Sequence, residues 1–83
     1  MASNVNLDSY TSLYPNPVNE SVNVVCLYKI KGYTLVDATG REVLSGKCNA
    51  NSMALDVSSL QKGVYFIKIH TAKGSVEKKL LVE

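Results

Sequence analysis

The sequence predicts an all-β fold, a small antiparallel immunoglobulin-like β-sandwich of about seven short strands. Apolar and polar residues alternate over short stretches, which is the period of a half-buried strand. Turn-forming residues separate these stretches roughly every eight to twelve positions, and no helical period of useful length occurs. The predicted strands cover residues 10–14, 21–28, 33–38, 41–47, 52–57, 64–70 and 75–83.

Prolines end the first predicted strand. Pro15 and Pro17 each fix their own backbone and push the preceding residue into extended geometry. The next strand, 21–28, alternates clearly, and residues 29–32 are predicted to connect it to the strand 33–38. One face of the strand 21–28 would carry Val22, Val24, Cys26 and Tyr28.

A hairpin turn is predicted in the middle of the chain. Asp37 and Gly40 occupy the first and fourth positions that a type I turn favours, so the strands on either side should form a hairpin. The polar residues 49–51 predict a further turn before the next strand.

A tight corner then feeds the most apolar strand. Ser58 and Gln61 have the spacing of a capping box, which predicts one short helical turn. Gly63 supplies the left-handed residue that ends such a turn. The strand 64–70 carries apolar residues on both faces near its start, so we expect it at the centre of the sheet. A turn closed by Gly74 leads to the last strand.

Size and composition limit the classes of function. The 83 residues suffice for one domain with a modest core. The net charge of +2 is small and the lysines are scattered, which argues against nucleic acid as a partner. No apolar run reaches the roughly 20 residues that span a bilayer, and no signal peptide is recognisable. Residues 1–3 are typical of an initiator and a cloning scar, so we expect a piece of a longer protein, with a tail in residues 1–12 and the domain in residues 13–83.

The two cysteines, Cys26 and Cys48, lack the spacing of a redox or zinc motif. Buried small hydrophobic side chains would explain them. A disulfide between them is the alternative. It would close a loop of about 22 residues and stabilise the fold by ~3 kcal/mol in an oxidising compartment.

Groups that could perform chemistry are sparse. The single histidine, His70, lies at the polar end of a strand, and no serine or cysteine is predicted to have a base within reach. Asp37 and Asp56 lie beside turns, where short carboxylates accept hydrogen bonds from backbone amides. Neither has a second acid within three residues to build a calcium site. The residues therefore predict no enzyme, no cofactor and no metal site.

Four segments in a fixed order identify a family resemblance. They are Leu13-Tyr14-Pro15-Asn16-Pro17, residues 36–43, residues 55–67 and Lys79-Leu80-Leu81-Val82. Together they resemble the type A C-terminal sorting domain of the type IX (Por) secretion system, which stands at the end of exported proteins of Bacteroidetes, gingipain-type proteases among them. The resemblance covers nearly the whole chain from Leu13.

The resemblance implies a C-terminal secretion signal that directs a cargo protein across the outer membrane. Its implied partners are the type IX translocon, the upstream cargo domain and a sortase-like peptidase that removes the signal as the cargo is anchored to the cell surface. The domain would be periplasmic in transit, then at the outer membrane and cell surface or secreted, with cleavage upstream of Tyr14. The family's Gly-x-Tyr motif falls on Gly63 and Tyr65. The stretch for translocon recognition falls on Lys79, Leu80, Leu81, Val82 and Glu83, although the family commonly ends in a basic residue.

The residues themselves leave alternatives open. A last strand read by a receptor would lend its edge to a partner sheet or insert its end into a pocket, whereas an ordinary last strand would only cover the core. A carbohydrate-binding or adhesion sandwich appended to a secreted enzyme is the alternative function, and it would need an exposed aromatic platform. A structural spacer is a third. Open strand edges would also allow a homodimer.

Overall fold

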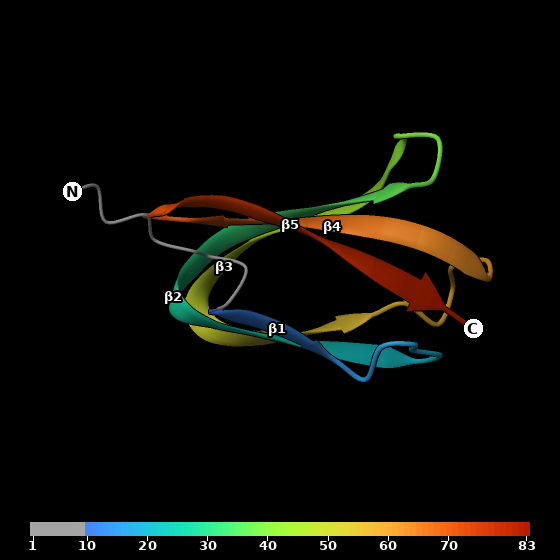
Figure 1. Cartoon of the computed structure of the whole chain (residues 1–83), viewed down its shortest axis with the longest axis horizontal. Helices are drawn as coiled ribbons and strands as arrows, with labels where there is room; N and C mark the ends of the chain where they lie inside the picture. The colour runs from blue at the N-terminus through green and yellow to red at the C-terminus, as the bar shows by residue number, and fades with distance from the viewer. Residues whose placement is uncertain (1–9) are drawn as a thin grey trace.

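The computed structural model describes residues 10–83, which form five strands in one antiparallel sheet (Figure 1). Residues 1–9 of the predicted tail lie outside the described residues, and residues 11 and 12 belong to the first strand. The prediction of an all-β antiparallel fold is confirmed. In chain order the strands are β1 (Thr11–Tyr14), β2 (Ser21–Asp37), β3 (Glu42–Asp56), β4 (Gly63–Thr71) and β5 (Gly74–Val82).

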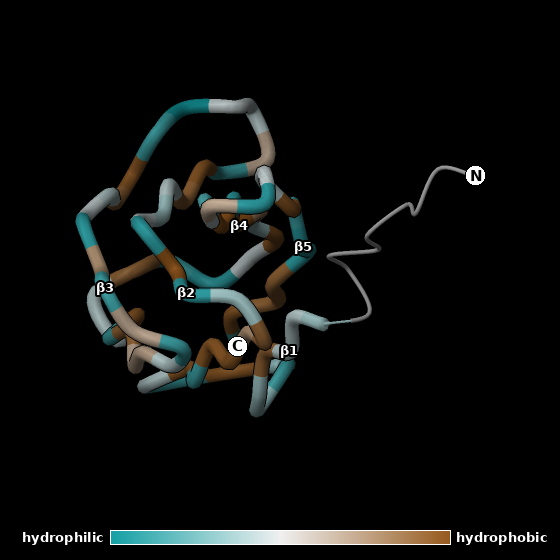
Figure 2. Tube along the Cα trace, turned by 90° about the vertical axis from the view of Figure 1, so that its left-hand side faces the viewer, coloured by the Kyte–Doolittle hydropathy of each residue, from teal (hydrophilic) through white to brown (hydrophobic). Residues whose placement is uncertain are grey.

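The long strand β2 organises the sheet. It pairs with β3 along most of its length, with β1 over its first half and with β4 over its second half. β5 then pairs with the far edge of β4. Register shifts interrupt the β2 ladder between Val25 and Ile30 and again before Gly32, and such irregularities bend strands. Seen end-on, the chain therefore curls around its core (Figure 2).

The strand number differs from the prediction because two predicted connections are continuous strand. Residues 29–32 lie within β2 and residues 49–51 within β3, so seven predicted segments become five strands in one curled sheet. The two-layer sandwich is not what the described residues show. Residues 49–51 do not form the predicted turn, because the side chain of Asn51 supports the irregular β2–β3 ladder. Asn51 donates its side-chain amide to the carbonyl oxygens of Cys26 at 3.2 Å and Leu27 at 2.9 Å.

Two glycines allow β2 and β3 to approach each other at this bend. A Cβ on Gly32 would lie 2.9 Å from the carbonyl oxygen of Gly46. A Cβ on Gly46 would in turn lie 2.9 Å from the ring of Tyr33. Both distances are shorter than a carbon atom tolerates. The two strands can therefore come this close only because glycine has no side chain.

The core lies inside the curl, and β4 is central as predicted. It is hydrogen-bonded to β2 on one edge and β5 on the other. Tyr65, Ile67 and Ile69 are buried on its inner face, while its other face is only half-buried or exposed. The buried apolar side chains are Val18, Val22, Val24, Cys26, Ile30, Leu35, Leu55, Val57, Tyr65, Ile67, Ile69, Val76, Leu80 and Val82.

Both cysteines are free thiols. Cys26 is buried in the core and accepts a hydrogen bond from the Thr11 hydroxyl at 3.4 Å. Cys48 is half-buried and packs against the core from β3. The interpretation as a buried small hydrophobic side chain is confirmed for Cys26, whereas Cys48 is only half-buried, and the alternative disulfide is not formed.

The predicted hairpin turn at residues 37–40 is confirmed. The prediction of a helical turn at residues 58–61 is wrong. Gly40 donates its backbone amide to the Asp37 carbonyl oxygen at 2.9 Å, which closes the predicted turn. At the corner, Ser58 donates its amide and its hydroxyl to Oδ1 of Asp56, at 2.9 and 2.6 Å. Asp56 thus accepts from the Ser58 amide that Gln61 would bind in a capping box, and the segment forms a turn.

The close approach of β2 and β3 predicts the effect of a single methyl group. Gly32→Ala should lower the free energy of unfolding by about 1–3 kcal/mol, because backbone must shift to relieve the contact. Urea denaturation would measure it. The exposed substitution Ser52→Ala on β3 is the control and should stay within about 0.5 kcal/mol of the wild type. An unchanged stability for Gly32→Ala would contradict this packing.

Candidate functional site

The two sets of residues that the sequence singled out meet at one end of the molecule. In the β4–β5 ladder, Gly63 pairs with Val82 and Tyr65 pairs with Leu80. Gly63 and Tyr65, here called the corner motif, are therefore neighbours of residues 79–83, here called the terminal stretch. Roughly a fifth of the chain separates the two in sequence. This end of the molecule is the candidate site.

The terminal stretch alternates between core and surface. Leu80 and Val82 point inward and are 0% and 3% exposed. Leu81 is half-buried, and Lys79 and Glu83 are exposed. Of the five predicted recognition residues, only Lys79 and Glu83 thus offer exposed side chains to a partner.

The outer edge of this stretch is already paired, by residues 16–18, which connect β1 to β2. Asn16 donates its side-chain amide to the Lys79 carbonyl oxygen at 2.9 Å and accepts from the Leu81 amide at 3.0 Å. Val18 donates its amide to the Leu81 carbonyl oxygen at 2.8 Å and accepts from the Glu83 amide at 2.7 Å. An open last edge, which addition to a partner sheet would use, is not present over these residues.

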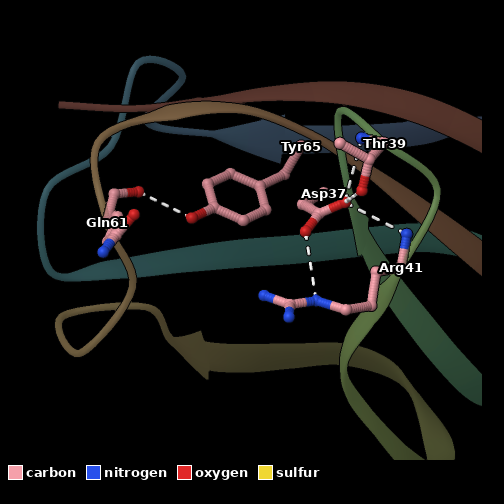
Figure 3. A network of polar contacts seen from close by, with 5 residues as sticks. All are labelled: Asp37, Thr39, Arg41, Gln61 and Tyr65. Atoms are coloured by element: carbon pink, nitrogen blue, oxygen red, sulfur yellow. Dashed lines mark hydrogen bonds and ion pairs between the residues drawn. The ribbon is translucent and has the colours of Figure 1, made fainter.

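The geometry of Gly63 and Tyr65 gives each of them a structural role. Gly63 has a φ of +152°, in the region that side chains disfavour. Tyr65 is 6% exposed and donates its hydroxyl to the Gln61 carbonyl oxygen at 2.7 Å (Figure 3). The ring therefore fills the core while its hydroxyl holds the corner, and both residues serve the fold directly.

A pocket of about 440 Å³ lies beside this motif, between the corner and the β2–β3 turn. Asp37 is ion-paired with Arg41, with 3.4 Å between Oδ2 and Nε, and its Oδ1 accepts from Thr39 and from the Arg41 amide (Figure 3). The hydrogen bond from the Thr39 hydroxyl, followed by the backbone amides, lowers the pKa of Asp37 below its ordinary value. The pocket wall is thus a mixture of one carboxylate, the cations of Arg41 and Lys62, and apolar side chains.

The candidate catalytic and metal groups do not assemble among the described residues. His70 contacts two hydroxyls, with Nε2 3.4 Å from Oγ1 of Thr34 and Nδ1 3.1 Å from Oγ of Ser75. Asp56 bonds to its own turn, and this lowers its pKa through Ser58. Within residues 10–83, no three His, Cys, Asp or Glu side chains lie close enough to hold a metal ion. The same residues contain no helix that could cross a membrane.

Sequence reasoning missed Asn16 and Val18. A signal was available, because Asn16 stands between two prolines that have no backbone N–H to donate. Within residues 15–17, only the Asn16 side chain can both donate and accept hydrogen bonds outside the backbone. Val18 is likewise an isolated apolar residue, and it is only 2% exposed.

Comparison with known proteins adds a family and a fold. Residues 12–83 match the family described as the secretion system C-terminal sorting domain. Among solved structures, PorZ, an essential surface component of the type IX secretion system of Porphyromonas gingivalis, aligns with a TM-score of 0.78 at 17% identity. The alignment covers 99% of this chain and 12% of PorZ, so the chain corresponds to a small part of that protein. No curated protein matches the sequence.

The hydrogen-bonded carboxylate at the pocket predicts how stability depends on pH. The pKa of Asp37 is lower in the folded chain than its ordinary 3.8, so the ionised form stabilises the fold. This contribution is present above pH 3.8 and is lost as the pH falls through the lower folded-state value. Asp37→Asn should therefore lower Tm at neutral pH, by an amount that shrinks toward about pH 2.

Thermal unfolding of wild type and variant at several pH values would test this. The exposed substitution Glu77→Gln, on β5, provides the control for loss of one negative charge. An Asp37→Asn difference that stays constant from neutral to acidic pH would show that the charge plays no part.

Proposed function

Because the chain belongs to the family of secretion system C-terminal sorting domains, we propose that it directs a cargo protein across the outer membrane through the type IX secretion system. A sorting domain is a non-catalytic signal, and it acts by interacting with secretion machinery that delivers its cargo to the cell surface. The observation that supports this most strongly is the family match over residues 12–83, which includes the four ordered motifs.

The finer steps follow as proposals from the same family. The domain begins near Leu13, passes through the periplasm behind its cargo and is removed by a sortase-like peptidase. The cargo then stays at the outer membrane and cell surface or is released. We assign recognition by the translocon to Lys79, Leu80, Leu81, Val82 and Glu83, with Gly63 and Tyr65 supporting this stretch through the fold.

We also propose an equivalence between the curled sheet and the predicted seven-stranded sandwich. Each of the long strands β2 and β3 changes partners or register near its middle. Counted as two segments each, they raise five strands to seven. The two halves of the curl would then correspond to the two layers of the sandwich.

A homodimer is a further proposal for the open edges. Among residues 10–83, β3 pairs with β2 alone, so its outer edge has no strand neighbour in this sheet. An edge of 15 residues could pair with the same edge of a second copy around a two-fold axis.

Exposed tyrosines are the feature that a carbohydrate-binding function would use. Tyr10 is 45% exposed and Tyr14 is 53% exposed. Tyr10 meets Tyr28 edge-on, with ring centres 5.8 Å apart and planes at 80°. A sugar stacks on the flat face of a ring, so this perpendicular pair does not make a continuous platform. We therefore favour the sorting function.

Export of a reporter tests the proposed function. The full 83-residue chain, fused behind a periplasmic reporter in a cell with a type IX system, should place the reporter on the cell surface. Lys79→Ala with Glu83→Ala should reduce surface delivery by roughly tenfold if these exposed side chains are bound. The free energy of unfolding should change by less than about 0.5 kcal/mol, because neither side chain is in the core.

The matched control is Lys68→Ala with Glu77→Ala. These two exposed residues pair across β4 and β5 and carry the same charges, but lie nearer the opposite end of the ladder. This variant should be exported like the wild type. Retention of the wild-type fusion in the periplasm would refute the function, and equal export of both variants would refute the assignment of the exposed residues.

A further inference from the structure

The contacts of residues 16–18 with β5 reproduce the pattern of a parallel strand. In a parallel ladder, one residue donates to and accepts from the two residues that flank its opposite number. Val18 does this around Val82, and the two form a parallel bridge. Residues 16–18 therefore occupy β5 in the way that an added strand would.

Asn16 continues this register with its side chain. It lies two positions before Val18, as Leu80 lies two positions before Val82. Its amide group donates to the carbonyl oxygen of Lys79 and accepts from the amide of Leu81, which are the two groups that flank Leu80. A primary amide offers the same donor and acceptor as a peptide group. The side chain thus takes the place that the backbone N–H and C=O of residue 16 would have in a regular parallel ladder.

The contacts define what could take the place of residues 16–18. The four backbone groups on this edge, from the Lys79 carbonyl to the Glu83 amide, match an extended peptide that runs parallel to β5. The residue opposite Val82 must be aliphatic, since the Val18 side chain that now lies there is 2% exposed and joins the core.

We propose that residues 16–18 form a removable cover over a strand-addition site on β5, where an extended segment of the export machinery pairs in parallel with residues 79–83. The proposal rests on the proposed export function and names the surface that the function uses. The cover keeps the edge from unwanted pairing before export. The partner then supplies backbone groups in place of the Asn16 side chain and an aliphatic residue in place of Val18.

A covalent lock on the cover tests the proposal. Val18 and Val82 are bridge partners, and neighbouring strands lie about 4.8 Å apart, which is within the range of Cα separations that a disulfide spans. Val18→Cys combined with Val82→Cys, fused behind the reporter, should deliver at least about tenfold less reporter to the surface than the same double variant kept reduced with dithiothreitol. Mass spectrometry of the periplasmic product should show the disulfide.

The outcomes separate this proposal from the proposed function. Surface delivery of the double variant with its disulfide intact, at the level of its reduced form, would overturn the cover. Failure of the wild-type fusion to reach the surface would instead refute the export function itself.

A second measurement does not depend on export. The probe is a synthetic peptide that copies residues 12–20. Asn16→Ala removes two hydrogen bonds of the cover, so this variant should bind the peptide at least about tenfold more tightly than the wild type. Asn51→Ala also removes two side-chain hydrogen bonds, but within the β2–β3 ladder and not on β5, and should bind like the wild type. Equal binding by Asn16→Ala and the wild type would overturn the proposal.

Discussion

The pairing of β2 with three other strands is the constraint on which the rest of the structure depends. β1 and β4 share one edge of β2, and β3 occupies the other. The strand must therefore bend between its two halves, and Gly32 allows this because β3 comes too close there for a side chain. The bend turns a flat sheet into a curl and gives a chain of this size an interior (Figure 2). Val22 and Leu35, from opposite halves of β2, are both fully buried in it.

A curled sheet brings its first and last segments together, and this closure joins the fold to the function. β5 lies at the far edge of β4, yet its end reaches residues 16–18 beside β1. Leu80 and Val82 are consequently part of the core, while Lys79 and Glu83 remain exposed. The proposed recognition stretch is thus hydrogen-bonded along its edge, while its alternate side chains are exposed. The cover over that edge is short, and half of its hydrogen bonds come from one asparagine side chain.

Local sequence patterns predict most of the strands and turns. The features that they do not predict depend on contacts between residues far apart in the sequence. Alternation located all the strands, and the turn of Asp37 and Gly40 and the central position of β4 were both foreseen. Residues 29–32 and 49–51 are predicted as connections, the latter from its polar residues, but both lie within long strands. Asn51 in fact satisfies carbonyls on another strand, a contact with residues more than twenty positions away. The roles of Asn16 and Val18 were missed for the same reason, since their partners lie at the opposite end of the sequence.

Native-state hydrogen exchange at the closure tests the central claim most directly. If residues 16–18 are a separable cover, the amides of Leu81 and Glu83, which bond to Asn16 and Val18, should exchange through a local opening. They would then exchange faster than the slowest amides of β4, and the gap should narrow when the cover is locked by the 18–82 disulfide. Exchange of Leu81 and Glu83 at the rate of the slowest β4 amides, with the same response to denaturant, would show that the cover opens only on global unfolding and would contradict the account.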